Sequence, residues 1–269
     1  MSKIRIAVAS TPLTATLAEA VPAAVAAVEE AGRLGAAIVC LPETGLPGHR
    51  MQRRPVEDAT PAALDEAVAA VAAAARRARV VTIVGTERPT PAGREIVQVV
   101  IDADGATLGA QTKTQMDPSE EVQYVASRAG RRVFTVAGVT FGIVICHESF
   151  RYPEITRALV LAGAQIVFAP HYVTTRDGSL PARWLDPASP YNEKALMCRA
   201  MENTVFVAAA NSAGPEQGSV TGIIGPDGAL VASVPYGQVG VVAAELDLER
   251  ATRLIARRWA PERSVRFAE

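Results

Sequence analysis

The chain has 269 residues, 49% of them hydrophobic and 20% charged, with a formal net charge of −1. This length fits one large α/β domain or two small ones and suffices to bury a substantial core. The balanced charge offers no basic surface for nucleic acid, and no apolar run reaches the roughly 18 residues of a membrane span. The first residues lead directly into a strand without a signal-peptide pattern, and the three Cys residues form no C-x-x-C pair. We therefore expect a cytoplasmic protein without disulfides.

Short apolar runs alternate with helical patterns along the chain. Strands are expected at 4–9, 36–41, 80–85, 165–169, 205–210 and 239–246. Helices are expected at 22–33, at 61 to about 77 after a Thr60-Pro61 start, at 153–162 and at 189–202. Turn-rich joints predict hairpins that pair 96–101 with 107–112, 133–136 with 139–145, and 222–224 with 230–234.

This order of elements predicts an α/β fold. Buried strands that are followed by helices form a sheet covered on one face, and two such sheets packed together cover the other faces. No linker or repeat divides the chain, so one domain over residues 1–269 is predicted. The stretches around 44–58 and 172–188 have the composition of long loops, which are often functional in compact domains.

A thiol stands at the end of an apolar strand. Residues 139–145 run directly into Cys146, and a helix start follows at Pro153-Glu154. Backbone N–H groups at such a turn face the same space as the side chain, so a thiolate there can attack a carbonyl while nearby donors hold the oxyanion. The alternative is a Cys that serves as a small core residue, which is what we expect for Cys40 and Cys198.

Two other strands end in residues that a thiol nucleophile needs. Glu43 follows the strand at 36–41, and Lys113 follows the strand at 107–112. A partly desolvated carboxylate has a raised pKa that suits proton transfer, and a cation can hold an oxyanion. Each residue alone can be a loop Glu or an edge-strand Lys. Three strand ends that carry Glu, Lys and Cys together predict a nucleophilic site.

The three His residues offer a different base. His147 directly follows Cys146, and neighbours in an extended segment point to opposite sides. His171 also ends a strand, so a Cys-His hydrolase remains an alternative, in which His171→Ala abolishes acylation and Glu43→Gln does not. His49 lies in a loop. Because His residues and Cys146 match none of the usual ligand spacings, no metal and no other cofactor is expected.

The chain resembles the nitrilase superfamily of carbon–nitrogen hydrolases. The blocks that carry this resemblance are Leu41-Pro42-Glu43, Lys113-Thr114-Gln115-Met116-Asp117, Phe141 to Cys146, Arg151-Tyr152-Pro153-Glu154, Arg199 to Asn203 with the strand Phe206–Asn211, and Ile223 to Gly228. They occur in family order from residue 4 to about 250. The distance from Cys146 to Glu154 is eight positions, one more than the family commonly has. The resemblance implies a four-layer αββα sandwich and a homodimer or larger homo-oligomer.

The resemblance also implies roles for individual residues. Glu43 would be the general base, Lys113 the cation that stabilises the oxyanion, and Cys146 the nucleophile. The backbone N–H of His147 would be a second oxyanion donor. A second Glu often follows the Lys in this family, and Glu121 is the first candidate for it, with Glu120 the second.

The implied activity is hydrolysis of a C–N bond in a small carboxamide or N-carbamoyl compound through a thioester. A nitrilase and a catalytically silent binding protein on the same fold are the alternatives. Nitrilases tend to carry Trp-Glu after the Cys, whereas this chain has His147-Glu148, which favours amides. The candidates for the substrate pocket are His171, Tyr172, Arg151 and Trp184. Arg151 can instead form an ion pair with Glu148 or Glu154.

Overall fold

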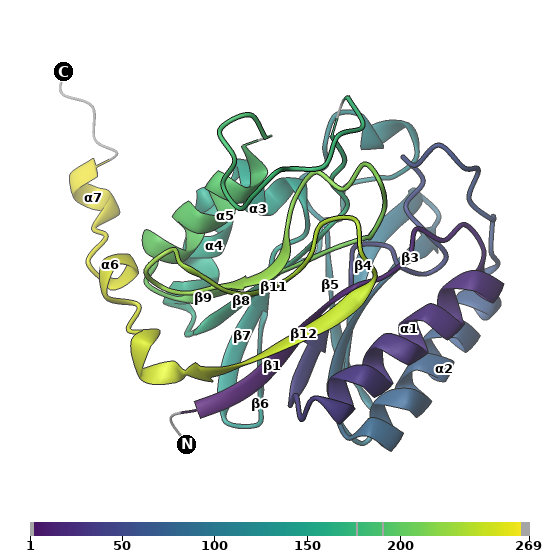
Figure 1. Cartoon of the computed structure of the whole chain (residues 1–269), viewed down its shortest axis with the longest axis horizontal. Helices are drawn as coiled ribbons and strands as arrows, with labels where there is room; N and C mark the ends of the chain where they lie inside the picture. The colour runs from purple at the N-terminus through teal and green to yellow at the C-terminus, as the bar shows by residue number, and fades with distance from the viewer. Residues whose placement is uncertain (1–2, 176, 190, 265–269) are drawn as a thin grey trace.

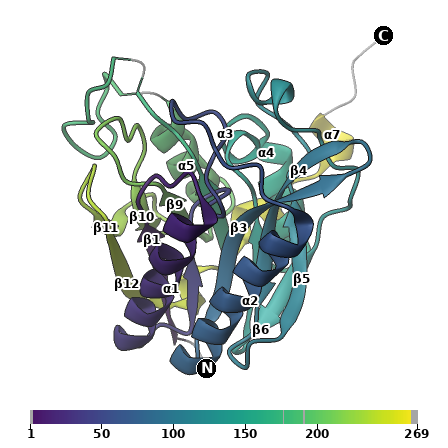
Figure 2. The ribbon, with the colours of Figure 1, turned by 90° about the vertical axis from the view of Figure 1, so that its right-hand side faces the viewer.

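The structure, a computed structural model, describes residues 3–175, 177–189 and 191–264. Two mixed six-stranded sheets pack face to face, with helices on both outer sides (Figures 1 and 2). The first sheet has the order β12 (Gly240–Asp247), β1 (Lys3–Ser10), β2 (Ile38–Cys40), β3 (Val81–Thr90), β4 (Gly93–Ile101) and β5 (Thr107–Thr112). The second has the order β11 (Leu230–Val234), β10 (Thr221–Ile224), β9 (Phe206–Asn211), β8 (Ile166–His171), β7 (Val139–Ile143) and β6 (Val133–Val136).

The helices cover the two outer faces. Helices α1 (Leu17–Arg33) and α2 (Pro61–Ala78) contact the first sheet, while α4 (Pro153–Leu161) and α5 (Asn192–Met201) contact the second. The one-turn helix α3 (His147–Arg151) lies against α4 and α5, and α6 (Leu254–Arg257) and α7 (Pro261–Ser264) end the described chain. The predicted αββα sandwich is confirmed. Among the described residues, no helix combines the length and the apolar character that crossing a bilayer requires.

Strand β1 shows how the sequence builds the layers. Its residues Ile4, Ile6 and Val8 belong to the core between the sheets, while Ala7 and Ala9 pack under α1 and α2. This alternation follows from the two-residue period of a strand, which is buried on both faces here. Strands β1, β2 and β3 are parallel, and so are β7, β8 and β9. Parallel neighbours end at the same edge, so residues that follow them gather there.

The observed elements differ from the expected ones at several places, including three that concern α1, the first sheet and the segment after Cys146. Helix α1 begins at Leu17, before Pro22, because the Thr16 side chain caps it by accepting a hydrogen bond from Glu19 N at 3.3 Å. Strand β3 continues to Thr90 and strand β4 begins at Gly93, so the two form a hairpin that was not expected. Helix α3 directly after Cys146 was not expected.

Gly85 on β3 lies tightly against the turn that carries Glu43. A Cβ atom at Gly85 would lie 2.3 Å from the carbonyl oxygen of Pro42 and 2.5 Å from the backbone nitrogen of Thr44. Gly85→Ala is therefore expected to displace this turn and to lower the free energy of unfolding by about 1–3 kcal/mol, measured by urea denaturation. Gly130→Ala is the control, because nothing lies within 4 Å of that position. Equal losses in the two variants would contradict the tight contact.

Candidate active site

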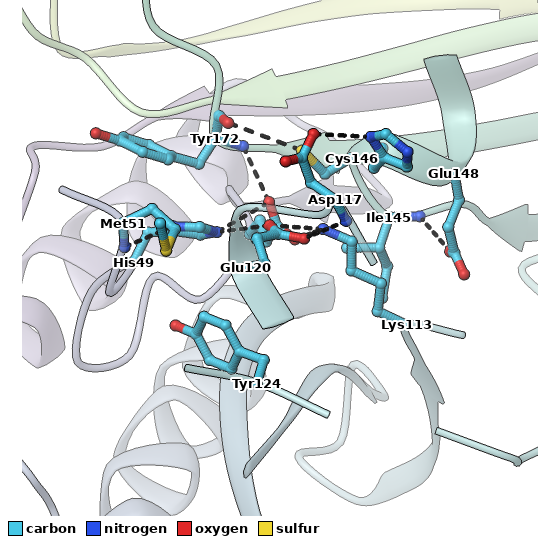
Figure 3. Close-up of polar contacts among 12 residues, drawn as sticks. His49, Met51, Lys113, Asp117, Glu120, Tyr124, Ile145, Cys146, Glu148 and Tyr172 are labelled. Atoms are coloured by element: carbon cyan, nitrogen blue, oxygen red, sulfur yellow. Dashed lines mark hydrogen bonds and ion pairs between the residues drawn. The ribbon is translucent and has the colours of Figure 1, made fainter. Parts of the chain in front are cut away.

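Four strand ends from both sheets meet beside one open cavity of about 980 Å³, whose lining includes residues from two of them. Glu43 follows β2 and Lys113 follows β5, both in the first sheet. Cys146 follows β7 and Tyr172 follows β8, both in the second sheet, and these two residues line the cavity. Figure 3 shows Lys113, Cys146 and Tyr172 converging between the sheets.

The centre of this region is a buried cluster of charged groups. Lys113 Nζ donates to Glu43 Oε1 at 2.8 Å and to both oxygens of Glu120 at 2.8 and 2.6 Å. Lys113 and Glu43 have side chains that are 0% exposed. Burial alone would lower the pKa of Lys113, but the carboxylate of Glu43 and its other anionic neighbours raise that pKa above its usual value. Burial likewise opposes the ionised form of Glu43, yet Lys113 and His49 hold the pKa of Glu43 below its usual range, so the raised pKa expected from the sequence was wrong.

The second carboxylate is Glu120, and the expectation for Glu121 was wrong. Glu120 is buried in the 3₁₀ turn η1 (Glu120–Val122), while Glu121 is exposed. Glu120 Oε2 also accepts a hydrogen bond from Asp117 N at 2.9 Å, which folds the turn back toward Lys113. Adjacent residues of such a turn point in different directions, so only one of the pair can face the lysine.

His49 is a member of this cluster that the sequence did not single out. Its Nε2 lies 3.2 Å from Glu120 Oε1 and 3.5 Å from Glu43 Oε2. Its ring is buried and stacks on Tyr172 with centroids 4.6 Å apart. Burial disfavours the charged ring, but the carboxylates of Glu120 and Glu43 more than offset this effect and raise the pKa of His49. The only sequence signal was its place in the long loop after Glu43.

Three of these groups have the geometry of cation ligands. One ligand atom each from Glu43, His49 and Glu120 lie within 4.8 Å of one another. However, Lys113 Nζ already bonds both carboxylates. A metal ion at this point would have to displace or repel a buried ammonium group. We therefore interpret the cluster as one that holds and moves protons.

Cys146 occupies a strained turn between β7 and α3. Its φ of 49° and ψ of −113° lie in a region that L-residues rarely adopt, which is a frequent feature of functional turns. Its Sγ is 3.7 Å from the carbonyl oxygen of Tyr172. Burial and the nearby Glu43 raise the pKa of this thiol well above its usual value, against the opposing effect of Lys113. The backbone N–H of His147 donates to no acceptor among the described residues, so it is free to bind an oxyanion.

Glu148 connects the turn of Cys146 to the turn after Lys113. Its fully buried carboxylate accepts hydrogen bonds from Ile145 N at 3.1 Å and from Thr114 N at 2.7 Å. It also pairs with Arg131. Because Ile145 and Thr114 directly adjoin Cys146 and Lys113, this carboxylate sets the distance between the two sheets at the site. The sequence carried no signal for this role.

Of the four residues expected to line the substrate pocket, two line the cavity and two do not. Tyr172 and Arg151 line the cavity, as does the ring of His147, whose Nδ1 is 3.0 Å from Asp117 Oδ2. Arg151 pairs with neither Glu148 nor Glu154 among the described residues and stacks over Tyr191, with its guanidinium carbon 4.1 Å from the ring centroid.

His171 and Trp184 do not line the cavity. His171 is fully buried, donates from Nδ1 to Ala169 O at 2.8 Å and packs its ring edge against Phe150. Burial lowers its pKa to about 4. Trp184 is half-buried against the core. Cys40 is buried as expected, but Cys198 is exposed rather than part of the core.

The two adjacent acidic residues of η1 provide a matched test of the cluster. Glu120→Gln replaces a charged acceptor that Lys113 Nζ contacts through both oxygens with a neutral amide, whose NH₂ group cannot accept from the ammonium. We therefore expect it to lower the free energy of unfolding at pH 7 by about 3 kcal/mol. Glu121→Gln should change it by less than about 0.5 kcal/mol, since Glu121 is exposed. Urea denaturation of both variants measures the difference. A larger loss for Glu121→Gln would contradict the assignment of Glu120.

Comparison with known proteins identifies the family of this chain. Residues 5–256 match the family described as Carbon-nitrogen hydrolase. An N-carbamoylputrescine amidase from Arabidopsis thaliana is 30% identical over 166 residues, 56% of this chain and 54% of that protein, so the chain spans about half the length of this relative. A nitrilase from Pyrococcus abyssi is 27% identical over 227 residues, 82% of this chain and 80% of that protein. A cysteine-to-alanine mutant of an amidase from Nesterenkonia AN1, of the nitrilase superfamily, shares the fold with a TM-score of 0.78 at 22% identity, over 96% of this chain and 95% of that one. The chain belongs to the carbon–nitrogen hydrolase family.

Proposed function

We propose that the protein hydrolyses a non-peptide C–N bond of a small carboxamide or N-carbamoyl compound through a thioester on Cys146, without a cofactor. The observation that carries this proposal is the buried Glu43–Lys113 ion pair at the foot of a cavity lined by a strained thiol. Membership of the family and the amidase relatives support the amide as the scissile group. We also propose a cytoplasmic location and a homodimer or larger homo-oligomer, as the sequence and the family imply.

The first half of the reaction forms the thioester. Cys146 Sγ attacks the substrate carbonyl carbon while Glu43 accepts the thiol proton. The negative charge moves to the carbonyl oxygen, where the Lys113 ammonium and the His147 N–H stabilise it. Collapse of the tetrahedral intermediate breaks the C–N bond, and Glu43 returns the proton to the leaving nitrogen as ammonia or an amine departs.

The second half consumes water. Glu43 deprotonates a water molecule that attacks the thioester carbon, and the same donors stabilise the second oxyanion. Breakage of the C–S bond releases the carboxylic acid, or the carbamic acid from a carbamoyl compound, and Glu43 returns the proton to sulfur. One carboxylate therefore acts in turn as base and acid.

The resting charges of the site support a concerted first step. Burial and Glu43 raise the thiol pKa, while Lys113 keeps Glu43 ionised. The proton therefore rests on sulfur in the free enzyme, and the thiol is not a standing thiolate. Proton transfer becomes favourable only as sulfur bonds to a carbonyl carbon and the negative charge passes to the carbonyl oxygen, which protects the cysteine from unproductive reactions.

Trapping of the acyl-enzyme tests the proposal. Glu43→Gln should slow turnover by at least about 100-fold, because it removes the base for both half-reactions. Intact-mass spectrometry with a panel of carboxamides, N-carbamoyl compounds and nitriles should then show an acyl adduct on Cys146. Cys146→Ala is the control that cannot form it. The proposal fails if no compound labels Cys146 and if Cys146→Ala retains any activity that the unaltered protein shows.

The alternative Cys-His mechanism makes the opposite prediction. Because Nδ1 of His171 is bonded to Ala169 O and no hydrogen bond joins His171 to Cys146 among the described residues, His171→Ala should still acylate Cys146 at a rate within about tenfold of the unaltered protein, provided that circular dichroism shows it to be folded. Stopped-flow measurement of product release in the first turnover gives this rate. Loss of acylation in folded His171→Ala, together with normal acylation in Glu43→Gln, would favour the Cys-His mechanism.

A further inference from the structure

We propose that His49 is a positioning residue of this site, whose Nε2–H binds Glu43 through the oxygen that Lys113 leaves free and bridges it to Glu120. Lys113 bonds Glu43 Oε1, whereas His49 faces Glu43 Oε2. The inference rests on the proposed function, because it concerns the state of the proposed base. It adds a residue from the loop after β2 to the strand-end groups.

Lys113, Glu43, His49 and Glu120 form a closed ring in which carboxylates alternate with nitrogen donors. Lys113 and His49 each contact both carboxylates, with the two distances from His49 Nε2 at 3.2 and 3.5 Å. Figure 3 shows His49, Glu120 and Lys113 in this sequence across the site. One ammonium does not neutralise two neighbouring carboxylates, so a second donor stabilises their ionised forms.

The hydrogen bond at the other ring nitrogen determines which atom carries the proton. Met51 N donates to His49 Nδ1 at 3.3 Å. An accepting Nδ1 leaves the single proton of the neutral ring on Nε2, and the charged ring carries a proton there as well. His49 therefore presents an Nε2–H donor to the carboxylates in either protonation state.

The loop that presents His49 is held on both sides. The next residue, Arg50, forms a double hydrogen bond with the buried Glu87 at 2.8 and 2.6 Å, and its N–H donates to Tyr124 at 3.1 Å. The ring of His49 stacks on Tyr172, whose own N–H donates to Glu43 Oε2 at 3.2 Å. The Tyr172 N–H thus donates to the same oxygen from which His49 Nε2 lies 3.5 Å, so both groups favour one orientation of the carboxylate. The titratable groups that surround the ring are Glu43, Glu120, Tyr124 and Tyr172, with Lys113 and Cys146 just beyond them.

The direction in which the loss of the His49 donor changes the pKa of Glu43 can be predicted. A donor beside a carboxylate favours its ionised form, so removing the donor raises the pKa of Glu43. Glu43 must be ionised to accept the thiol proton. The acid limb of the pH–rate profile should therefore move to higher pH when His49 loses its Nε2–H.

Two variants separate the hydrogen bond from the packing of the ring. His49→Gln keeps an N–H donor but has no ring, whereas His49→Phe keeps a ring for stacking on Tyr172 but has no donor. We expect His49→Phe to lower kcat/KM at pH 7 by about 10- to 100-fold, mainly through kcat, and to move the acid limb upward by about one pH unit. His49→Gln should recover most of this loss. Thermal denaturation of both variants serves as the folding control.

A second readout does not depend on turnover. The rate at which iodoacetamide alkylates Cys146, followed by peptide mass spectrometry from pH 3 to pH 7, where the Glu43 carboxyl group gains its proton, should show the same upward shift of the acid limb in His49→Phe and a smaller one in His49→Gln. Cys198, which is exposed, provides an internal reference in each sample. If no amide, carbamoyl compound or nitrile is hydrolysed, the proposed function fails, while the alkylation profiles still test His49.

Three results would overturn the inference. The first is a His49→Phe protein with unaltered pH profiles. The second is a better-preserved profile in His49→Phe than in His49→Gln, which would assign His49 to ring stacking. The third is an equal shift in both variants, which would show that the N–H donor does not rescue the site.

Discussion

Lys113 imposes the main constraint on this structure, because its ammonium group has no access to solvent. A buried charge is tolerated only with close partners of opposite sign. The two partners come from different segments, Glu43 from the turn after β2 and Glu120 from η1. The ends of β2 and β5 and the turn at η1 must therefore meet at one point. This requirement sets the floor of the cavity and the position of the proposed base.

The nucleophile reaches this cluster from the other sheet. Cys146 and Lys113 belong to chain segments in different sheets, and the site depends on how these sheets pack. Glu148 and Arg131 connect the two turns through hydrogen bonds, so the distance between thiol and ammonium is set locally as well as by the core. Helix α3, which directly follows Cys146, is held by Arg199 through the carbonyl oxygens of Ser149 and Phe150.

Much of the fold and the central residues of the site were predictable, because both depend on local patterns. Apolar runs with a two-residue or helical period identified most strands and helices, and polar residues at strand ends identified Glu43, Lys113 and Cys146 as candidates that the structure brings to one edge. The choice between Glu120 and Glu121 was not predictable, since it depends on which side of a short turn faces a lysine. His171 was the alternative strand-end base, and only the structure shows that its Nδ1 is bonded to Ala169 O and that its ring packs against Phe150.

The sequence by itself determined the order of the elements, the layered arrangement and three strand-end groups, because strand periodicity and parallel neighbours follow from short-range sterics and hydrogen bonding. Only the tertiary structure decided which groups share a charge cluster. His49 and Glu120 lie 71 positions apart in the sequence, and Glu148 acts on a turn that follows a strand of the other sheet. Their contacts arise from the loop path and from the packing of the two sheets. No local pattern encodes them, because an electrostatic interaction depends on distance in space and on the exclusion of water.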